Sequence, residues 1–165
     1  MESTAIQPKE AAEYSFQAME ALDEQQITDE MKGHIIDSFV YEVAGKTGLS
    51  WAGIKAMAER MKNQGQPISV EHMEITQSED GMTFRAICIA KNLATGEKRT
   101  GASEQKRFYD KEMTKEVPFA YVLAGSKAQR NAIRHFLPES SITAAIDEWK
   151  SKRMVTQSKY KEVKP

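Results

Sequence analysis

Hydrophobic positions along the chain follow two periods, one typical of strands and the other of helices. A run of β-branched and aromatic residues predicts a strand at about 35–43, and glycines at positions 45 and 48 end it. Apolar residues then recur at helical spacing, which predicts a helix at about 51–63. Ser50 is a suitable N-cap for this helix, because a serine oxygen can accept a hydrogen bond from a free amide of the first turn.

Two strand-like runs, residues 68–77 and 82–91, are joined by a turn that contains Asp-Gly, a dipeptide typical of tight hairpins. In the second run, alternate residues from Phe84 to Ala90 are apolar or small and share one face, which predicts that this face is buried. A short polar strand at about 97–103 follows another turn. The three runs predict an antiparallel β-meander.

Two further helices are predicted beyond a charged connection at 104–117. Pro118 suits the first turn of a helix that extends to about Phe136 and has small residues on its inner side. A last helix at about 140–152 has apolar residues at the spacing of one buried face. The expected fold class is therefore α+β. A long helix packs on a β-meander (a β-β-β-α core), with a strand and a helix before it and a C-terminal helix after it.

Charge is distributed unevenly along the chain. Residues 1–30 carry eight acidic residues against one lysine, a net charge of −7, although the whole chain has a net charge of −1. Residues 127–165 carry nine basic residues against four acidic ones, a net charge of +5. We therefore predict three regions: an acidic N-terminal arm at 1–32, one domain at 33–153, and a basic flexible tail at 154–165. Two alternatives stay open for the arm: a weak amphipathic helix over 8–24, or a segment that is disordered or loosely docked.

The patterns that usually carry catalysis are missing from the sequence. Gly45-Lys46-Thr47 resembles the end of a phosphate-binding loop, but that loop needs a glycine at position 40, where the chain has Val40. The three histidines are far apart in sequence and lie outside metal-ligand spacing. We therefore expect no enzymatic activity, no metal and no cofactor.

Cysteine usage and hydropathy bear on the compartment. Cys88 is the only cysteine and lies in an apolar run, where it is expected to be a small core residue. The longest apolar stretches are far too short to cross a bilayer, and the first residues do not resemble a secretory signal. These features favour a reducing cytoplasm and no association with a membrane.

The helix predicted at 118–136 carries a row of cations. Lys127, Arg130 and Arg134 are spaced by three and four residues and therefore project from one face, where Asn131 adds hydrogen-bonding groups. Cations at this pitch can contact successive phosphates of a nucleic acid. The alternative is an ordinary solvated helix surface.

A second basic group contains aromatic residues, a combination typical of grooves in which bases stack on rings while cations follow the backbone. Its members are Lys98, Arg99, Lys106, Arg107, Phe108, Tyr109 and Lys111. The alternative for this group is a solvated loop.

Three stretches resemble the core of the Rad-fifty-two-like single-strand annealing proteins. GLSWAGIKAMAERM resembles the helix before the family's meander, and MTFRAICIAKNLATGEKRTGAS resembles its central hairpin with a glycine, here Gly101. AYVLAGSKAQRNAIRHFLP resembles the signature helix with its basic-x-Ala-aliphatic-Arg pattern, which runs here from Arg130 to Arg134. The resemblance covers about residues 35–137.

The resemblance implies a homo-oligomer, as a ring or a helical filament, that holds single-stranded DNA in a basic groove and anneals complementary strands without ATP. Arg130 and Arg134 match basic groove residues of the family, whereas Asn131 stands where the family often has a second base. The short chain is more similar to phage-type recombinases, whose partners include an exonuclease or a single-strand-binding protein. This likeness implies the cytoplasm of a prokaryote or of a phage-infected host cell. Two alternatives stay open: a protein that protects single-stranded DNA without annealing it, and an adaptor whose basic helix docks an acidic partner.

Overall fold

The structure, a computed structural model, describes the backbone of residues 8–158 and the side chains of residues 15–156. In chain order its elements are α1 (Pro8–Met31), β1 (Val40–Val43), β2 (Lys46–Leu49), α2 (Trp51–Asn63), β3 (Ile68–Gln77), β4 (Thr83–Asn92), β5 (Lys98–Lys106), α3 (Ala120–Arg134), α4 (Glu139–Ser151) and β6 (Val155–Ser158). The predicted α+β class, with a long helix against an antiparallel meander, is confirmed.

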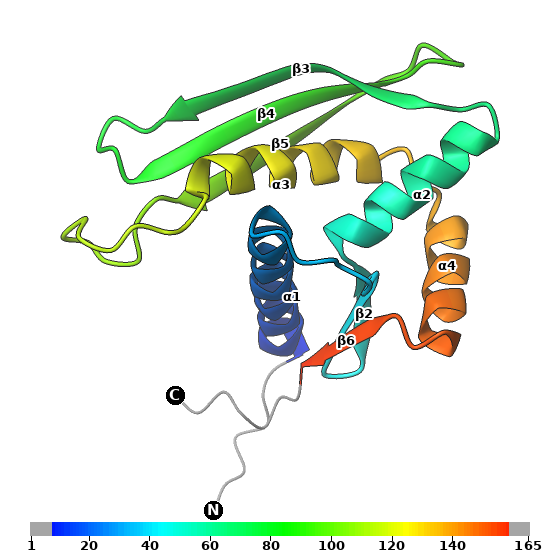
Figure 1. Cartoon of the computed structure of the whole chain (residues 1–165), viewed down its shortest axis with the longest axis horizontal. Coiled ribbons are helices and arrows are strands. Elements are labelled where there is room, and N and C mark those ends of the chain that lie inside the picture. The colour runs from blue at the N-terminus through cyan, green and yellow to red at the C-terminus, as the bar shows by residue number, and fades with distance from the viewer. Residues whose placement is uncertain (1–7, 159–165) are drawn as a thin grey trace, which may run out of the picture.

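The larger sheet is the meander β3-β4-β5, and it curves over one side of α3 (Figure 1). Ala86, Cys88 and Ala90 of β4 are buried, as the alternation in this strand predicted. Small residues of α3, among them Ala124 and Ala128, are buried in the same core. Small side chains on both surfaces allow the helix to lie close to the sheet.

The closest approach between helix and sheet occurs at Gly101 of β5. A Cβ atom at this position would lie 2.2 Å from the backbone nitrogen of Ala132 and 2.3 Å from the carbonyl oxygen of Ala128. Both atoms belong to the backbone of α3 and cannot move aside without shifting the helix. Only glycine fits between β5 and α3 here.

Helix α2 begins as predicted, because the Gly53 amide donates a hydrogen bond of 3.0 Å to the Ser50 Oγ. The strand predicted at 35–43 is shorter, and β1 starts at Val40. Residues 46–49 were predicted to be a turn but form β2, which pairs antiparallel with β1. The physical reason is a two-residue turn in which Ala44 and Gly45 both have positive φ, the conformation of a tight hairpin.

The segment predicted to be the start of a flexible tail is a strand. Val155–Ser158 forms β6, which lies parallel to β1 on the edge opposite β2. The backbone amides of Phe39 and Val40 both donate hydrogen bonds to the carbonyl oxygen of Met154, at 3.0 and 3.2 Å. The edge of β1 that β2 leaves free has amides and carbonyls that need hydrogen-bond partners. Pairing with β6 supplies them and holds residues 155–158 in a strand. The rest of the predicted tail, residues 159–165, lies outside the described residues.

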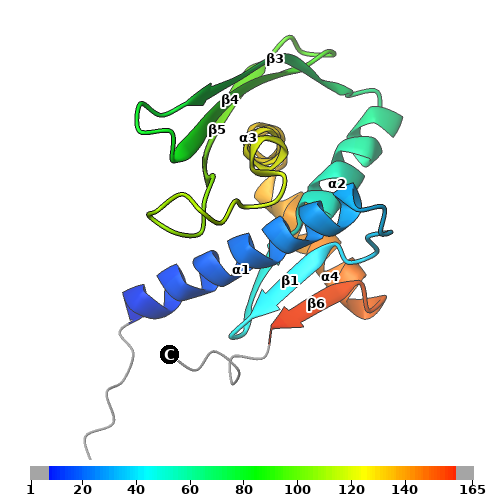
Figure 2. The same ribbon diagram turned by 60° about the vertical axis from the view of Figure 1, so that its left-hand side comes forward.

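Of the two alternatives for the N-terminal segment, the structure shows the helix, and α1 is longer than predicted, with 24 residues from Pro8 to Met31. Figure 2 shows α1 crossing between α3 and the small sheet β2-β1-β6. Asp23 and Ile27 are buried on its inner face, with exposed fractions of 2% and 3%. Residues 1–7 lie outside the described residues. None of the described helices is both long enough and apolar enough to span a membrane.

The close approach at Gly101 generates a stability prediction. Replacing Gly101 with alanine places a methyl group against the backbone of α3, and we expect the free energy of unfolding to fall by about 3 kcal/mol. Gly125→Ala is the matched control, since its Cβ would meet only the mobile Cδ1 of Ile75, at 3.2 Å. Urea unfolding of both variants checks this, and equal midpoints would contradict the close approach.

Candidate functional site

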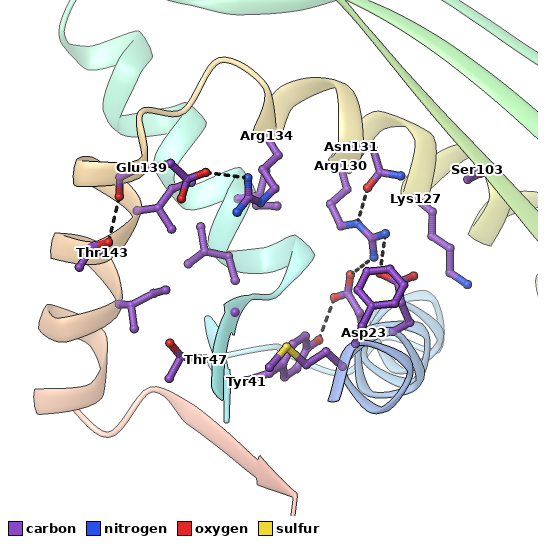
Figure 3. A pocket seen from close by; sticks show the side chains of 18 of the residues that line it. Asp23, Tyr41, Thr47, Ser103, Lys127, Arg130, Asn131, Arg134, Glu139 and Thr143 are labelled. Carbon is purple, nitrogen blue, oxygen red and sulfur yellow. Dashed lines mark hydrogen bonds and ion pairs between the residues drawn. The ribbon is translucent and has the colours of Figure 1, made fainter. Parts of the chain in front are cut away.

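An open cleft of about 690 Å³ lies among α1, β2, α3 and α4, and Figure 3 shows its side chains. One wall is formed by the residues predicted from the spacing along α3, which the structure brings together here: Lys127, Arg130, Asn131 and Arg134. We call this set the cationic wall. Apolar residues line other parts of the cleft, namely Phe16, Met19, Leu49, Ile54, Ile142 and Ile146.

Arg130 lies at the centre of the cationic wall and is only 8% exposed. Its Nη1 donates to the Asp23 Oδ2 at 2.7 Å, and its Nη2 is 2.8 Å from the Glu20 Oε1. Its Nε donates to the Asn131 Oδ1 at 3.1 Å. Burial acts to lower the pKa of Arg130, but the two carboxylates outweigh burial and raise it.

Asp23 joins α1 to three other elements. Besides Arg130 on α3, its Oδ1 accepts hydrogen bonds of 2.8 Å from the Tyr41 hydroxyl on β1 and from the Trp51 amide at the start of α2. Burial raises the pKa of Tyr41 far above its ordinary value, and the negative charge of Asp23 raises it further. The Tyr41 hydroxyl therefore stays protonated and remains a donor.

Lys127 is also buried, with an exposed fraction of 7%. Its Nζ donates to the Gln105 Oε1 on β5 at 2.7 Å and to the Glu24 Oε2 on α1 at 3.1 Å. The neutral amide of Gln105 therefore holds this cation on the side of the sheet, and Glu24 holds it on the side of α1.

Arg134 is the member of the cationic wall most open to solvent, with a side chain 45% exposed. Its Nη1 lies 3.3 Å from the Glu139 Oε1 at the start of α4. Asn131 uses its Nδ2 to donate to the carbonyl oxygen of Ala102 at 2.8 Å. With its Oδ1 on Arg130, the Asn131 amide links β5 to the guanidinium.

The carboxylates that line the cleft outnumber the cations of its wall. The residues that line the cleft include three cations and four acidic residues, Glu20, Asp23, Glu104 and Glu139. The cations are therefore already paired within the chain, and an anionic ligand has to compete with these carboxylates. A row of cations at helical spacing shows which side chains share a face but does not show what covers that face.

The second basic group is spread along the meander and is not gathered at one point. Lys98 and Lys106 stand at opposite ends of β5, eight residues apart, which corresponds to about 26 Å in an extended strand. Lys98 pairs with Glu71 at 3.0 Å, and Arg99 pairs with its neighbour Glu97. Lys98 and Arg99 thus lie apart from the rest of the group.

The aromatic part of the second group lies at the Lys106 end. Arg107 stacks on Phe84 and Phe108, with its guanidinium carbon 4.9 and 5.1 Å from the ring centroids. It also donates a hydrogen bond to the carbonyl oxygen of Gly81, at 2.8 Å. Phe108 is buried, so Arg107 and Phe108 hold the loop in place. Tyr109 and Lys111 are exposed in the same loop.

The sequence reasoning missed the acidic partners on α1. Glu20, Asp23 and Glu24 are spaced by three and one residues, so they lie on one side of a helix. The cations of α3 also lie on one side of a helix, and complementary charged faces in the acidic and basic parts of the chain were the available signal. Among the described residues, no three His, Cys, Asp or Glu side chains are placed to hold a metal ion.

Comparison with known proteins assigns the chain to no family. No protein-family model matches the sequence, and no curated protein matches it. Among solved structures, the chain is similar to a candidate polyketide cyclase from Xanthomonas campestris pv. campestris at a TM-score of 0.26 and 14% identity. The match covers 70% of this chain and 96% of that one. A likeness at this level assigns neither a fold nor a function.

The contacts of Asp23 generate a second stability prediction. Asp23→Ala removes the acceptor of three hydrogen bonds and leaves Arg130 buried with fewer partners, so we expect the free energy of unfolding to fall by about 3 kcal/mol or more. Tyr41→Phe removes only one hydrogen bond and should lower it by about 1 kcal/mol. Urea unfolding measures both, and a Tyr41→Phe loss as large as that of Asp23→Ala would contradict the central role of Asp23.

Proposed function

We propose that this protein binds single-stranded DNA along the cleft and anneals complementary strands as an oligomer, without a nucleotide cofactor. The observation that carries the proposal is the gathering of Lys127, Arg130, Asn131 and Arg134 in one open cleft. The resemblance of the meander and of α3 to single-strand annealing proteins points in the same direction.

The chemistry of the cleft suits a flexible single strand. The cationic wall attracts phosphates, and apolar side chains such as Phe16 and Met19 offer contacts for sugars and bases. Phe16 is 64% exposed, so its ring is accessible to a base. A duplex places its bases inside and gains little from such a surface.

The exposed residues at the Lys106 end of the meander support a second contact region. Lys106, Tyr109 and Lys111 are exposed there, as are Phe119 and Tyr121. Rings that lie among cations stack with bases without regard to sequence. We propose that a strand that leaves the cleft, or a second strand, contacts this region.

Annealing requires two phosphate backbones to approach each other while the base edges stay free to pair. Cations that neutralise one backbone lower the repulsion, and an oligomer extends the strand over several subunits. In the described part of the chain, β3 and β5 each have one edge without a partner strand. Such edges can pair with another copy and so support the oligomer, which is a ring or a filament. A cytoplasmic location and cooperation with an exonuclease or a single-strand-binding protein belong to the same proposal.

The test is the rate at which two complementary oligonucleotides anneal with and without the protein, in the absence of ATP. A large acceleration supports the proposal. Tight binding of single strands without acceleration would instead make the protein a protective binder. If neither occurs, the proposal fails and an adaptor with an acidic protein partner becomes the better hypothesis.

Arg134 offers a site variant that leaves the buried contacts intact. Because its side chain is 45% exposed, we expect Arg134→Ala to fold normally and to weaken binding of single-stranded DNA severalfold. The slope of log affinity against log salt should become shallower by about 0.7. Lys62→Ala, an exposed cation on α2 outside the cleft, is the control. If both variants weaken binding equally, Arg134 has no specific role.

A further inference from the structure

We propose that Glu20 and Glu24 of α1 contact the cations of the wall where phosphate groups of single-stranded DNA would bind. They thereby compete with the DNA and lower the affinity of the cleft for it. This inference rests on the proposed function. In this role α1 is an internal competitor of the nucleic acid. Its two carboxylates leave the cations when phosphates bind and return when the phosphates leave.

The contacts of the two glutamates are of the kind that a phosphate would make. The Glu20 Oε1 lies 2.8 Å from the Nη2 of Arg130, and the Glu24 Oε2 lies 3.1 Å from the Nζ of Lys127. These are charge-assisted contacts between a cation and an anionic oxygen, and phosphate oxygens are equally good acceptors. The two glutamates are four residues apart, one turn of α1, and so reach neighbouring cations.

Exposure separates these two carboxylates from Asp23. The side chains of Glu20 and Glu24 are 30% and 29% exposed, whereas that of Asp23 is 3% exposed. The glutamates can therefore turn toward water, while Asp23 stays on Tyr41 and Trp51 and holds α1 in place. Exchange with DNA then requires two side-chain rotations and no unfolding of the helix.

The cations also keep their positions when the glutamates leave. Lys127 retains the Gln105 Oε1 at 2.7 Å, and Arg130 retains Asp23 and Asn131. A buried cation without any partner is strongly destabilising, and these remaining contacts avoid that state. Lys127 and Arg130 thus have partners that stay in place, namely Gln105, Asp23 and Asn131. They also have partners that exchange, namely Glu20 and Glu24.

This exchange has a consequence for annealing. Each subunit binds its stretch of DNA weakly, because part of the binding energy replaces ion pairs that exist already. Linked subunits together still retain the strand. As a duplex forms and its phosphates leave the cleft, Glu20 and Glu24 return to the cations. The internal competitor therefore favours release of the product.

The decisive experiment compares two double variants with the same change in charge. In Glu20→Gln/Glu24→Gln the competing charges are removed, and we expect a labelled oligothymidine to bind roughly tenfold more tightly in fluorescence anisotropy at moderate salt. Glu59→Gln/Glu79→Gln changes two exposed carboxylates outside the cleft and should alter the affinity less than about twofold. Thermal unfolding confirms that all proteins are folded.

A third variant locates the effect. In a Lys127→Ala background, Glu24→Gln should give no gain in affinity over Lys127→Ala alone, since the cation that Glu24 contacts is then absent. If both double variants gain affinity equally, or if Glu24→Gln still increases affinity in the Lys127→Ala background, the competition is refuted and the proposed function stands. If no folded protein, wild type included, binds the oligonucleotide, the proposed function itself is refuted.

Discussion

The buried ion pair between Asp23 and Arg130 is the interaction on which the rest of the structure depends. Both members of the pair have further partners: Asp23 also accepts from Tyr41 and Trp51, and Arg130 also contacts Glu20 and Asn131. A buried charge without such partners would be strongly destabilising. One carboxylate thus connects α1, β1, α2 and α3.

The position of α1 follows from this pair, and the cleft follows from the position of α1. Without the helix, the cationic wall of α3 would face solvent, and the residues of α1 that line the cleft, Phe16 and Met19 among them, would be absent. On its other side α3 is fixed by the close contact with Gly101, which sets its distance from the meander. The cations of α3 are therefore held between a rigid sheet and an acidic helix.

The same cations serve stability and, in our proposal, recognition. Lys127 and Arg130 have partners that anchor them in the fold and partners at the solvent edge, whereas Arg134 pairs with Glu139 and has a side chain 45% exposed. The three cations share one face of α3, but Lys127 and Arg130 are buried and Arg134 is exposed. This difference in burial explains why their substitution has different effects. Removing Arg130 disturbs the core, and removing Arg134 changes the surface.

The sequence by itself determined what depends on neighbours along the chain. The Asp-Gly hairpin, the Ser50 cap of α2 and the shared face of Lys127, Arg130 and Arg134 could all be predicted, because a turn, a cap or a helical face involves residues a few positions apart. Only the tertiary structure decided that Val155–Ser158 pairs with β1 and that the acidic arm is a helix docked on the cations. Both features join segments more than 100 residues apart, and the free energy that orders them comes from contacts absent in either segment alone.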